Sequence, residues 1–322
     1  MRRREFLGMA GAVVAAGVAR KASAQAQNWP DRPVKLILPY APGGGTDLIG
    51  RPWAEKLSQS FGQQFIIENR GGAGGMIGTE AAAKAAPDGY SFLLTPNATL
   101  SVLPSLRKTP YDPKAFLPVG RVGDFVTGFS MHPAVGPTTF KEMIDYAKAN
   151  PGKLSYGSAG LGTATHLRIE MLKYRAGIDI LHVPYRGSAD ALNDHLPNTV
   201  QMMNEINTIP HVKAGKLLLL NINSTTRHPD FPEVPTLTEC GYANSDVPIW
   251  YSLFAPAGTP KPIVDKLNAK VVELANTDEM RDRMRAINTV VPIQTPEEMV
   301  SYLEDDTARN VELIKATNLK LE

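Results

Sequence analysis

A run of three glycines, Gly43–Gly45, is the feature of this sequence that most directly suggests chemistry. It follows an apolar segment that predicts a strand and precedes residues 47–61, whose periodicity predicts a helix. Glycine lets the backbone turn sharply and lets another molecule approach closely, and the N-terminus of a helix offers unpaired N–H groups and a positive dipole end. The pattern predicts a seat for a small anion, a phosphate or a carboxylate, formed by Tyr40, Ala41, Gly43, Gly44, Gly45, Thr46 and Asp47. A tight turn that Thr46 or Asp47 caps is the alternative.

A second loop of small residues, between Ser155 and Thr163, repeats this arrangement. A short predicted strand leads through it into a helix that starts near Thr163, and His166 lies one turn into that helix. Because parallel sheets bind ligands at the carboxyl ends of their strands, two such loops that face each other across a cleft would hold one anion between them. A capped turn with His166 on the surface is again the alternative. The candidate residues of this loop are Ser158, Ala159, Gly160, Gly162, Thr163 and His166.

Motifs typical of enzymes are missing from the sequence. Ser158 near two glycines is similar to a nucleophile turn, but Tyr156 occupies the first glycine position of G-x-S-x-G. No H-E-x-x-H occurs, the six histidines have no metal-ligand spacing, and no glycine run gives G-x-G-x-x-G. The sequence therefore predicts no catalytic residue, no metal and no cofactor, and an exported hydrolase stays an alternative. The single Cys240 excludes an internal disulfide.

The first 24 residues predict an export signal. Arg2–Arg4 form a charged region, residues 6–19 are apolar but too short to span a bilayer, and Ala22-Ser23-Ala24 is a cleavage site. The adjacent arginines followed by Phe6 and Leu7 fit the twin-arginine type, with an ordinary secretory signal as the alternative. Removal of residues 1–24 takes away five basic residues and one acidic residue, which changes the formal charge from +2 to −2. We therefore expect a soluble protein outside the cytoplasm that does not bind nucleic acid.

The remaining chain alternates between strand-like and helix-like segments, which predicts an α/β protein with mostly parallel sheets flanked by helices. Its length suggests two domains. Strands are predicted at residues 33–40, 64–68, 90–95, 117–122, 125–130, 153–156, 179–184, 200–203 and 216–222. Helices are predicted at residues 47–61, 75–86, 100–106, 138–150, 163–175, 188–196, 206–214, 262–275, 278–286 and 296–315, the last with a capping box from Thr295 and Glu298.

Several short motifs in a fixed order resemble one known family. The chain is similar, nearly end to end, to receptors of the tripartite tricarboxylate transporter family, also called the Bug family of periplasmic solute-binding proteins. The motifs are residues 39–47, 68–75, 86–90, 111–113, 147–153, 156–160, 182–187, 235–237 and 255–260.

The resemblance implies a two-lobed periplasmic binding protein clamshell, type II-like, in which each lobe is a mostly parallel sheet flanked by helices. One lobe would contain residues 26–125 plus 250–322, and the other residues 126–249. A small carboxylate, either an aliphatic di- or tricarboxylate or an aromatic acid, would sit on the two glycine loops, partly through water, and amide or amino-acid ligands stay open. Closure of the lobes would let the receptor, a monomer in the periplasm, dock on membrane permease subunits. A ligand-sensing module for a membrane sensor kinase would need the same clamshell and is the alternative.

One segment departs from the family pattern. Where the family has an aromatic residue followed by aspartate, this chain has Asn204 and Glu205. Glu205 would hold an amino or hydroxyl group or repel a second carboxylate, with a surface carboxylate as the alternative. Asn97 is a candidate for another wall of the pocket, and Tyr40 and Tyr185 could line it or pack in the core.

Overall fold

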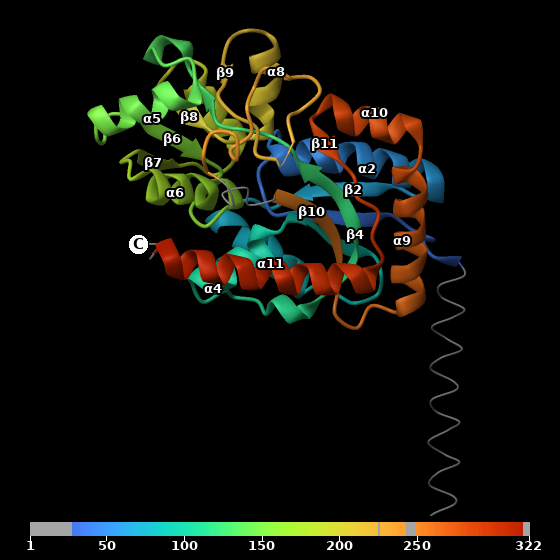
Figure 1. Ribbon diagram of the computed structural model, residues 1–322. Coiled ribbons are helices and arrows are strands. Elements are labelled where there is room, and N and C mark those ends of the chain that lie inside the picture. Colours follow the sequence, from blue (N-terminus) through green and yellow to red (C-terminus); the bar gives the residue numbers. More distant parts are fainter. Residues whose placement is uncertain (1–27, 225, 243–248, 318–322) are drawn as a thin grey trace, which may run out of the picture.

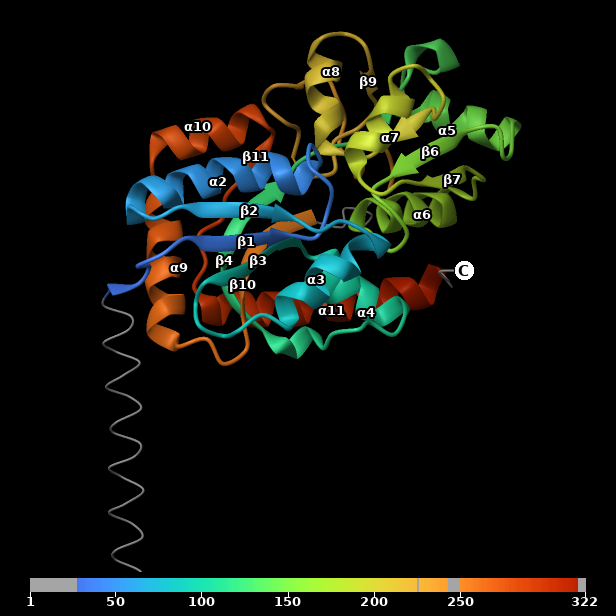
Figure 2. The same ribbon diagram turned by 180° about the vertical axis from the view of Figure 1, so that it is seen from behind.

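The computed structural model describes residues 28–224, 226–242 and 249–317. The predicted export signal lies outside these residues. Within them, the strands form one six-stranded and one five-stranded sheet, each flanked by helices (Figures 1 and 2). None of the described helices has the length and apolar character needed to cross a membrane.

The six-stranded sheet has the order β11-β4-β10-β3-β1-β2. β1 pairs in parallel with β2 and β3, whereas β10 pairs antiparallel with β3 and β4. Its strands are β1 (Val34–Leu38), β2 (Phe65–Asn69), β3 (Ser91–Pro96), β4 (Phe116–Phe125), β10 (Ile249–Pro256) and β11 (Thr289–Val290).

The five-stranded sheet has the order β7-β6-β8-β5-β9 and is also mixed. β6 pairs in parallel with β7 and β8, and β5 pairs antiparallel with β8 and β9. Its strands are β5 (Ser130–Met131), β6 (Ser155–Ser158), β7 (Leu181–Pro184), β8 (Met202–Met203) and β9 (Leu218–Leu219).

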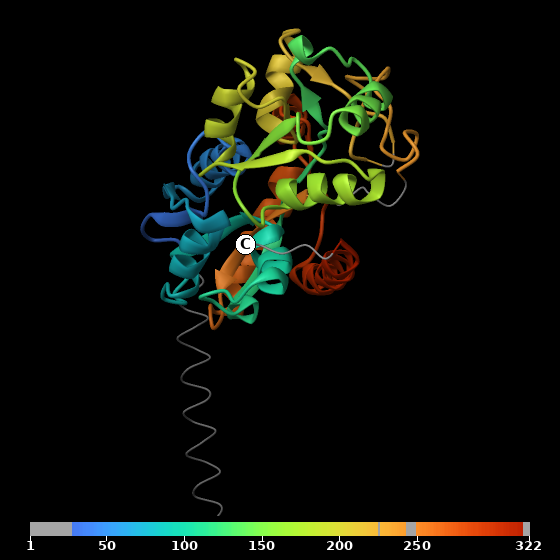
Figure 3. The ribbon, with the colours of Figure 1, turned by 90° about the vertical axis from the view of Figure 1, so that its left-hand side faces the viewer.

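The helices divide between the two sheets in the same way. The six-stranded sheet carries α2 (Gly45–Phe61), α3 (Met76–Ala83), α4 (Leu103–Leu106), α9 (Lys261–Ala275), α10 (Asp278–Ala286) and α11 (Pro296–Thr317). The five-stranded sheet carries α5 (Phe140–Ala149), α6 (Ala164–Ala176), α7 (Ser188–His195) and α8 (Ile209–Lys213). We call the first group lobe 1 and the second group lobe 2; in the side view of Figure 3, α6 of lobe 2 lies above α11 of lobe 1.

Alternation of side chains along the strands of lobe 1 creates two apolar layers. Leu36 and Leu38 pack with the helices α2 and α9, whereas Ile37 between them packs on the opposite face with α3 and α11. The strand β10 repeats this division, with Tyr251 in the first layer and Trp250 in the second. A sheet buried on both faces is rigid, so it fixes the position of the loops at the carboxyl ends of its strands.

The α/β class with two lobes is confirmed, and some of its details are corrected. The sheets are mixed and not mostly parallel, because the chain returns to lobe 1 through β10, a strand that the sequence analysis did not predict. The predicted helix at residues 100–106 is a π-helical turn, Ala98–Val102, followed by the short α4. Thr139, and not Thr138, caps α5, whereas the capping box of Thr295 and Glu298 is confirmed. The predicted lobe boundaries near residues 125 and 250 stay a prediction.

Candidate functional site

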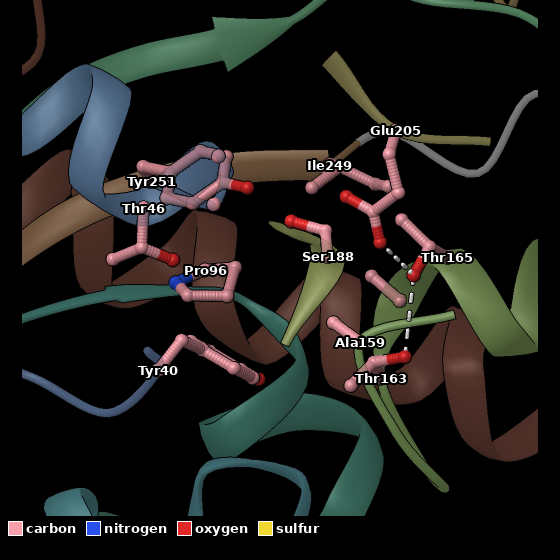
Figure 4. A pocket seen from close by; sticks show the side chains of 13 residues that line it. Tyr40, Thr46, Pro96, Ala159, Thr163, Thr165, Ser188, Glu205, Ile249 and Tyr251 are labelled. Atoms are coloured by element: carbon pink, nitrogen blue, oxygen red, sulfur yellow. Dashed lines mark hydrogen bonds between the residues drawn. The ribbon is translucent and has the colours of Figure 1, made fainter. Parts of the chain in front are cut away.

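A cavity of about 30 Å³ lies between the two lobes, where the N-termini of three helices meet (Figure 4). Glycines at the start of α2 come from lobe 1, and the first turns of α6 and α7 come from lobe 2. The lobes touch around this cavity: a Cβ atom on Gly44 would lie 2.8 Å from Oγ of Ser188. The lining residues are Tyr40, Gly44, Gly45, Thr46, Pro96, Ala159, Thr163, Ala164, Thr165, Ser188, Glu205, Ile249 and Tyr251.

The loop of lobe 1 has unused hydrogen-bond donors. Gly44 is the N-cap of α2, and Gly43, with a φ of 79°, turns the chain before it. In the described part of the chain, the N–H groups of Gly44, Gly45 and Thr46 donate to no backbone or side-chain acceptor. The first N–H groups of a helix together with its dipole favour an anion. This loop can therefore receive a carboxylate or another small anion.

Asp47 fixes the shape of this loop. Its Oδ2 accepts hydrogen bonds from the N–H of Gly43 at 3.0 Å and from Nε of Arg51 at 2.7 Å. Its Oδ1 accepts from Arg51 Nη2 at 3.1 Å and from Asn69 Nδ2 at 3.2 Å. Both carboxylate oxygens are engaged within lobe 1, and Asp47 does not line the cavity. Asp47 acts on the site indirectly, because it holds the loop whose glycines line the cavity.

The loop of lobe 2 uses most of its donors internally. Thr163 caps α6 by accepting from the N–H of His166, and it donates its own hydroxyl to the carbonyl of Gly160 at 2.8 Å. The N–H of Gly162 donates to Nδ1 of His166 at 3.2 Å, and the N–H of Gly160 donates to Oγ of Ser158 at 3.1 Å. Most donors of this turn therefore have their acceptors within the turn itself.

Glu205 is the charged residue among the described residues that line the cavity, and it is 3% exposed. Its Oε1 accepts a hydrogen bond from Oγ1 of Thr165 at 2.7 Å. Figure 4 shows the other oxygen pointing away from Thr165, on the side of Ser188. Burial raises the pKa of Glu205 to about 7, against the opposing effects of Thr165, Ala159 and the Arg168 guanidinium.

Arg168 is a buried cation beside this site that the sequence analysis missed. It is 1% exposed, and its Nη1 donates to Oδ1 of Asn204 at 2.9 Å. Asn204 therefore orients Arg168 and does not line the cavity. The signal in the sequence was the spacing of three between Thr165 and Arg168, which places both on one face of α6.

Two tyrosines form walls of the cavity. The hydroxyl of Tyr40 donates to the carbonyl of Gly74 at 3.0 Å, and Tyr251 forms a hydrogen bond with the side chain of Thr46. Burial raises the pKa of both phenols well above the ordinary value, so they are neutral hydrogen-bonding groups. Tyr251 and Ile249 were missed because they lie on β10, and Ser188 was missed as the first residue of α7.

The structure brings part of the predicted site residues together and places the others nearby. Those that line the cavity are Tyr40, Gly44, Gly45, Thr46, Ala159, Thr163 and Glu205; those outside the lining are Ala41, Gly43, Asp47, Asn97, Ser158, Gly160, Gly162, His166, Tyr185 and Asn204. Nδ2 of Asn97 donates to Asp306 of α11 at 3.0 Å, and the hydroxyl of Tyr185 donates to Asp194 at 2.6 Å. A direct role in binding stays a prediction for all of these residues.

The neighbourhood of Ser158 and His166 bears on the hydrolase alternative. Oγ of Ser158 lies 2.7 Å from Nε2 of His182, and the ring of His182 stacks on that of His166 at 4.2 Å. Burial lowers the pKa of His182 to about 3 and that of His166 to about 4, so both rings are neutral and weak as bases. Ser158 is fully buried and does not face the cavity. This geometry favours a packing role for Ser158.

Comparisons with known proteins place this architecture in a family. The family model described as "Tripartite tricarboxylate transporter family receptor" matches residues 49–319. Protein BugT of Bordetella pertussis is 33% identical over 318 residues, which are 96% of each chain. The solved structure of R. palustris Rpa4515 with adipate is 31% identical, with a TM-score of 0.88 over 91% of this chain and 99% of that one. MatC from Rhodopseudomonas palustris with bound malate is 29% identical, with a TM-score of 0.84 over 89% of this chain and 100% of that one. The chain therefore belongs to the family of tripartite tricarboxylate transporter receptors, which are solute-binding proteins.

Proposed function

We propose that this receptor captures a small carboxylate between its two lobes in the periplasm and delivers it to the membrane subunits of a tripartite tricarboxylate-type transporter. The observation that carries the proposal is the set of unused N–H groups at Gly44, Gly45 and Thr46, which open into an interlobe cavity. Adipate and malate in the relatives Rpa4515 and MatC support a carboxylate as the ligand.

The strength of these donors is sufficient for a receptor. A hydrogen bond to a charged group contributes roughly 1.5–3 kcal/mol, and micromolar affinity corresponds to about 8 kcal/mol. The three N–H groups, assisted by the hydroxyl of Ser188 across the cavity, supply an interaction of this order. Closure strengthens each bond because it removes water and lowers the local dielectric constant. Binding therefore requires only that the two lobes close on the ligand, without any covalent change to it.

The proposal includes the rest of the receptor's cycle. We propose that the chain is exported with residues 1–24 as its signal, works as a monomer and carries lobes with the boundaries predicted above. A cavity of about 30 Å³ has room for about two water molecules, so a ligand enters while the lobes are open and the closed form then signals occupancy to the permease.

A thermal-shift screen with purified protein and small carboxylates tests this function. A ligand at 100 times its dissociation constant adds about 2.7 kcal/mol to the stability, which gives a readable shift. We expect at least one carboxylate to stabilise the protein without being converted. Turnover of the ligand, or no shift with any carboxylate, would contradict the proposal.

Two substitutions at one position isolate the contribution of a donor. Gly44→Pro removes an N–H group that faces the cavity, whereas Gly44→Ala keeps it, and both introduce a Cβ atom near Ser188 Oγ. We expect Gly44→Pro to bind the carboxylate about tenfold more weakly than Gly44→Ala, as measured by calorimetry. Equal affinities for the two variants would remove this N–H group from the binding site.

A further inference from the structure

The carboxyl group of Glu205 occupies the position in lobe 2 where a second ligand carboxylate would bind. Thr165 is in the first turn of α6, and its hydroxyl donates to Glu205 at 2.7 Å; Ala159 of the glycine loop lines the same end of the cavity. A donor in the first turn of a helix is what an anion needs at a helix N-terminus. The protein's own carboxyl group therefore already uses this end of the cavity.

Lobe 1 offers the opposite arrangement. Its only carboxylate near the cavity wall, within the described residues, is Asp47, which is bound to Gly43, Arg51 and Asn69 and leaves the N–H groups of Gly44, Gly45 and Thr46 unused. Ser188 lies beside these groups at the start of α7. The cavity thus has one end that attracts an anion and one end that already carries a carboxyl group.

Among the described residues, the positive groups around the cavity can balance one additional carboxylate. The buried Arg168 favours the ionised form of Glu205, and the N-terminus of α2 can compensate one ligand carboxylate. No Lys, Arg or His is among the described residues that line the cavity, so a second ligand carboxylate would meet Glu205 without a counter-charge. An ammonium group in that position would instead donate a hydrogen bond to the buried carboxyl group of Glu205.

We propose that Glu205 selects a small amino acid, whose carboxylate binds the first turn of α2 and whose ammonium group donates to the Glu205 oxygen that does not accept from Thr165. This inference rests on the proposed function and narrows its ligand class.

Proton exchange on binding distinguishes this ligand from a dicarboxylate. Among the described residues, the charged and titratable groups that face Glu205 are Arg168 of α6, Tyr251 of β10 and Tyr40 after β1, and both phenols stay neutral near pH 7. With its pKa raised to about 7, Glu205 is partly protonated before an amino acid binds and ionised afterwards, so binding releases a proton. A dicarboxylate would bind the protonated form and take up a proton.

Calorimetry in two buffers of different ionisation enthalpy measures both affinity and proton exchange. The panel is alanine, β-alanine, lactate, malate and adipate, titrated into the purified protein at pH 6, 7 and 8. We expect an amino acid to bind best, with proton release and an affinity that rises from pH 6 to pH 8. Binding of malate or adipate at least as tight as that of both amino acids would overturn the inference but leave the carboxylate receptor intact. Failure of every acid to bind would overturn both.

Glu205→Gln tests whether Glu205 is the cause of the selection. It keeps the shape and removes the charge, and Glu233→Gln makes the same change at an exposed position of lobe 2. We expect Glu205→Gln to bind the amino acid about tenfold or more weakly, to lose the proton release and to improve the relative affinity for malate. Glu233→Gln should behave like the wild type. An unchanged ratio of amino acid to malate affinity in Glu205→Gln would overturn the inference.

Discussion

At the scale of single residues, the two acidic side chains nearest the cavity have different tasks because their surroundings differ. Asp47 is bound by Arg51 and by two neutral donors, so its charge is fully used inside lobe 1. Glu205 has one neutral donor, Thr165, and near it a cation, Arg168, that contacts Asn204. Burial therefore dominates at Glu205 and leaves its protonation sensitive to pH near neutrality.

This sensitivity gives a prediction for stability. The pKa of Glu205 is raised from 4.5 in the unfolded chain to about 7 in the fold. The stability that the protonated carboxyl group gives the fold is therefore fully present below pH 4.5 and is lost as the pH rises through 7. Glu205→Gln removes this loss. We expect the ligand-free variant to become more stable than the wild type with rising pH, by on the order of 3 kcal/mol above pH 7. Urea unfolding of both proteins between pH 4 and pH 8 measures the difference, which the Glu233→Gln control should not show. A difference that is flat with pH would mean that Glu205 is hydrated in the ligand-free protein.

The sequence was sufficient to find the two glycine loops, but only part of the cavity. Strand, small residues and helix form a local pattern, so Gly44, Gly45 and Ala159 could be predicted from their neighbours in the chain. Tyr251 and Ser188 could not, because they reach the cavity through the pairing of β10 with β3 and through the packing of α7 against the loop at Ala41. Such contacts depend on tertiary structure, which no local pattern encodes.

At the scale of elements, the helix α11 is joined to the core of lobe 1 by a buried carboxylate. Oδ2 of Asp306 accepts hydrogen bonds from Ser101 at 2.7 Å, Asn97 at 3.0 Å and Asn310 at 3.1 Å. Asn97 and Ser101 belong to the π-helical turn and its N-cap, at the end of β3.

We expect Asp306→Ala to lower the free energy of unfolding by about 3 kcal/mol or more, because it leaves these donors buried without their acceptor. Asp305→Ala is the matched control, since Asp305 is exposed on the same helix and the change in helix propensity is the same. Urea unfolding of the two variants measures the effect. Similar stability of both variants would show that the donors find other acceptors.

The same scale shows why the sheets were predicted less well than the helices. The periodicity of α2, α5 and α9 identifies them directly, whereas β10 is apolar at nearly every position because both its faces are buried. A continuous apolar run does not alternate and is not marked by the flanking signals of a half-buried strand. Because β10 was not predicted, its antiparallel pairing with β3 and β4 was not predicted either. The sheet was therefore expected to be mostly parallel.

At the scale of the whole molecule, backbone from one lobe touches backbone from the other. A Cβ atom on Gly74 of lobe 1 would lie less than 3.0 Å from the carbonyl oxygen of Leu161 of lobe 2. The main chain fixes the position of a Cβ atom, and the carbonyl oxygen is itself a main-chain atom, so a side-chain rotation cannot relieve this contact. Only separation of the lobes can, which makes Gly74 a position where closure can be blocked without a change in the binding residues.

We therefore expect Gly74→Ala to weaken ligand binding about tenfold or more and to keep the receptor open, because a clash of its Cβ atom with the carbonyl oxygen of Leu161 opposes closure. Gly62→Ala is the matched control: its φ of 68° is nearly that of Gly74, 67°, but no atom lies within 4 Å of its added Cβ. Both variants should lose about 1 kcal/mol of stability through the left-handed conformation, and only Gly74→Ala should lose affinity. Small-angle scattering with saturating ligand should show a larger radius of gyration for Gly74→Ala than for Gly62→Ala. Equal affinity and equal size of the two variants would mean that the ligand is held without the contact between Gly74 and Leu161, and that closure has a different geometry.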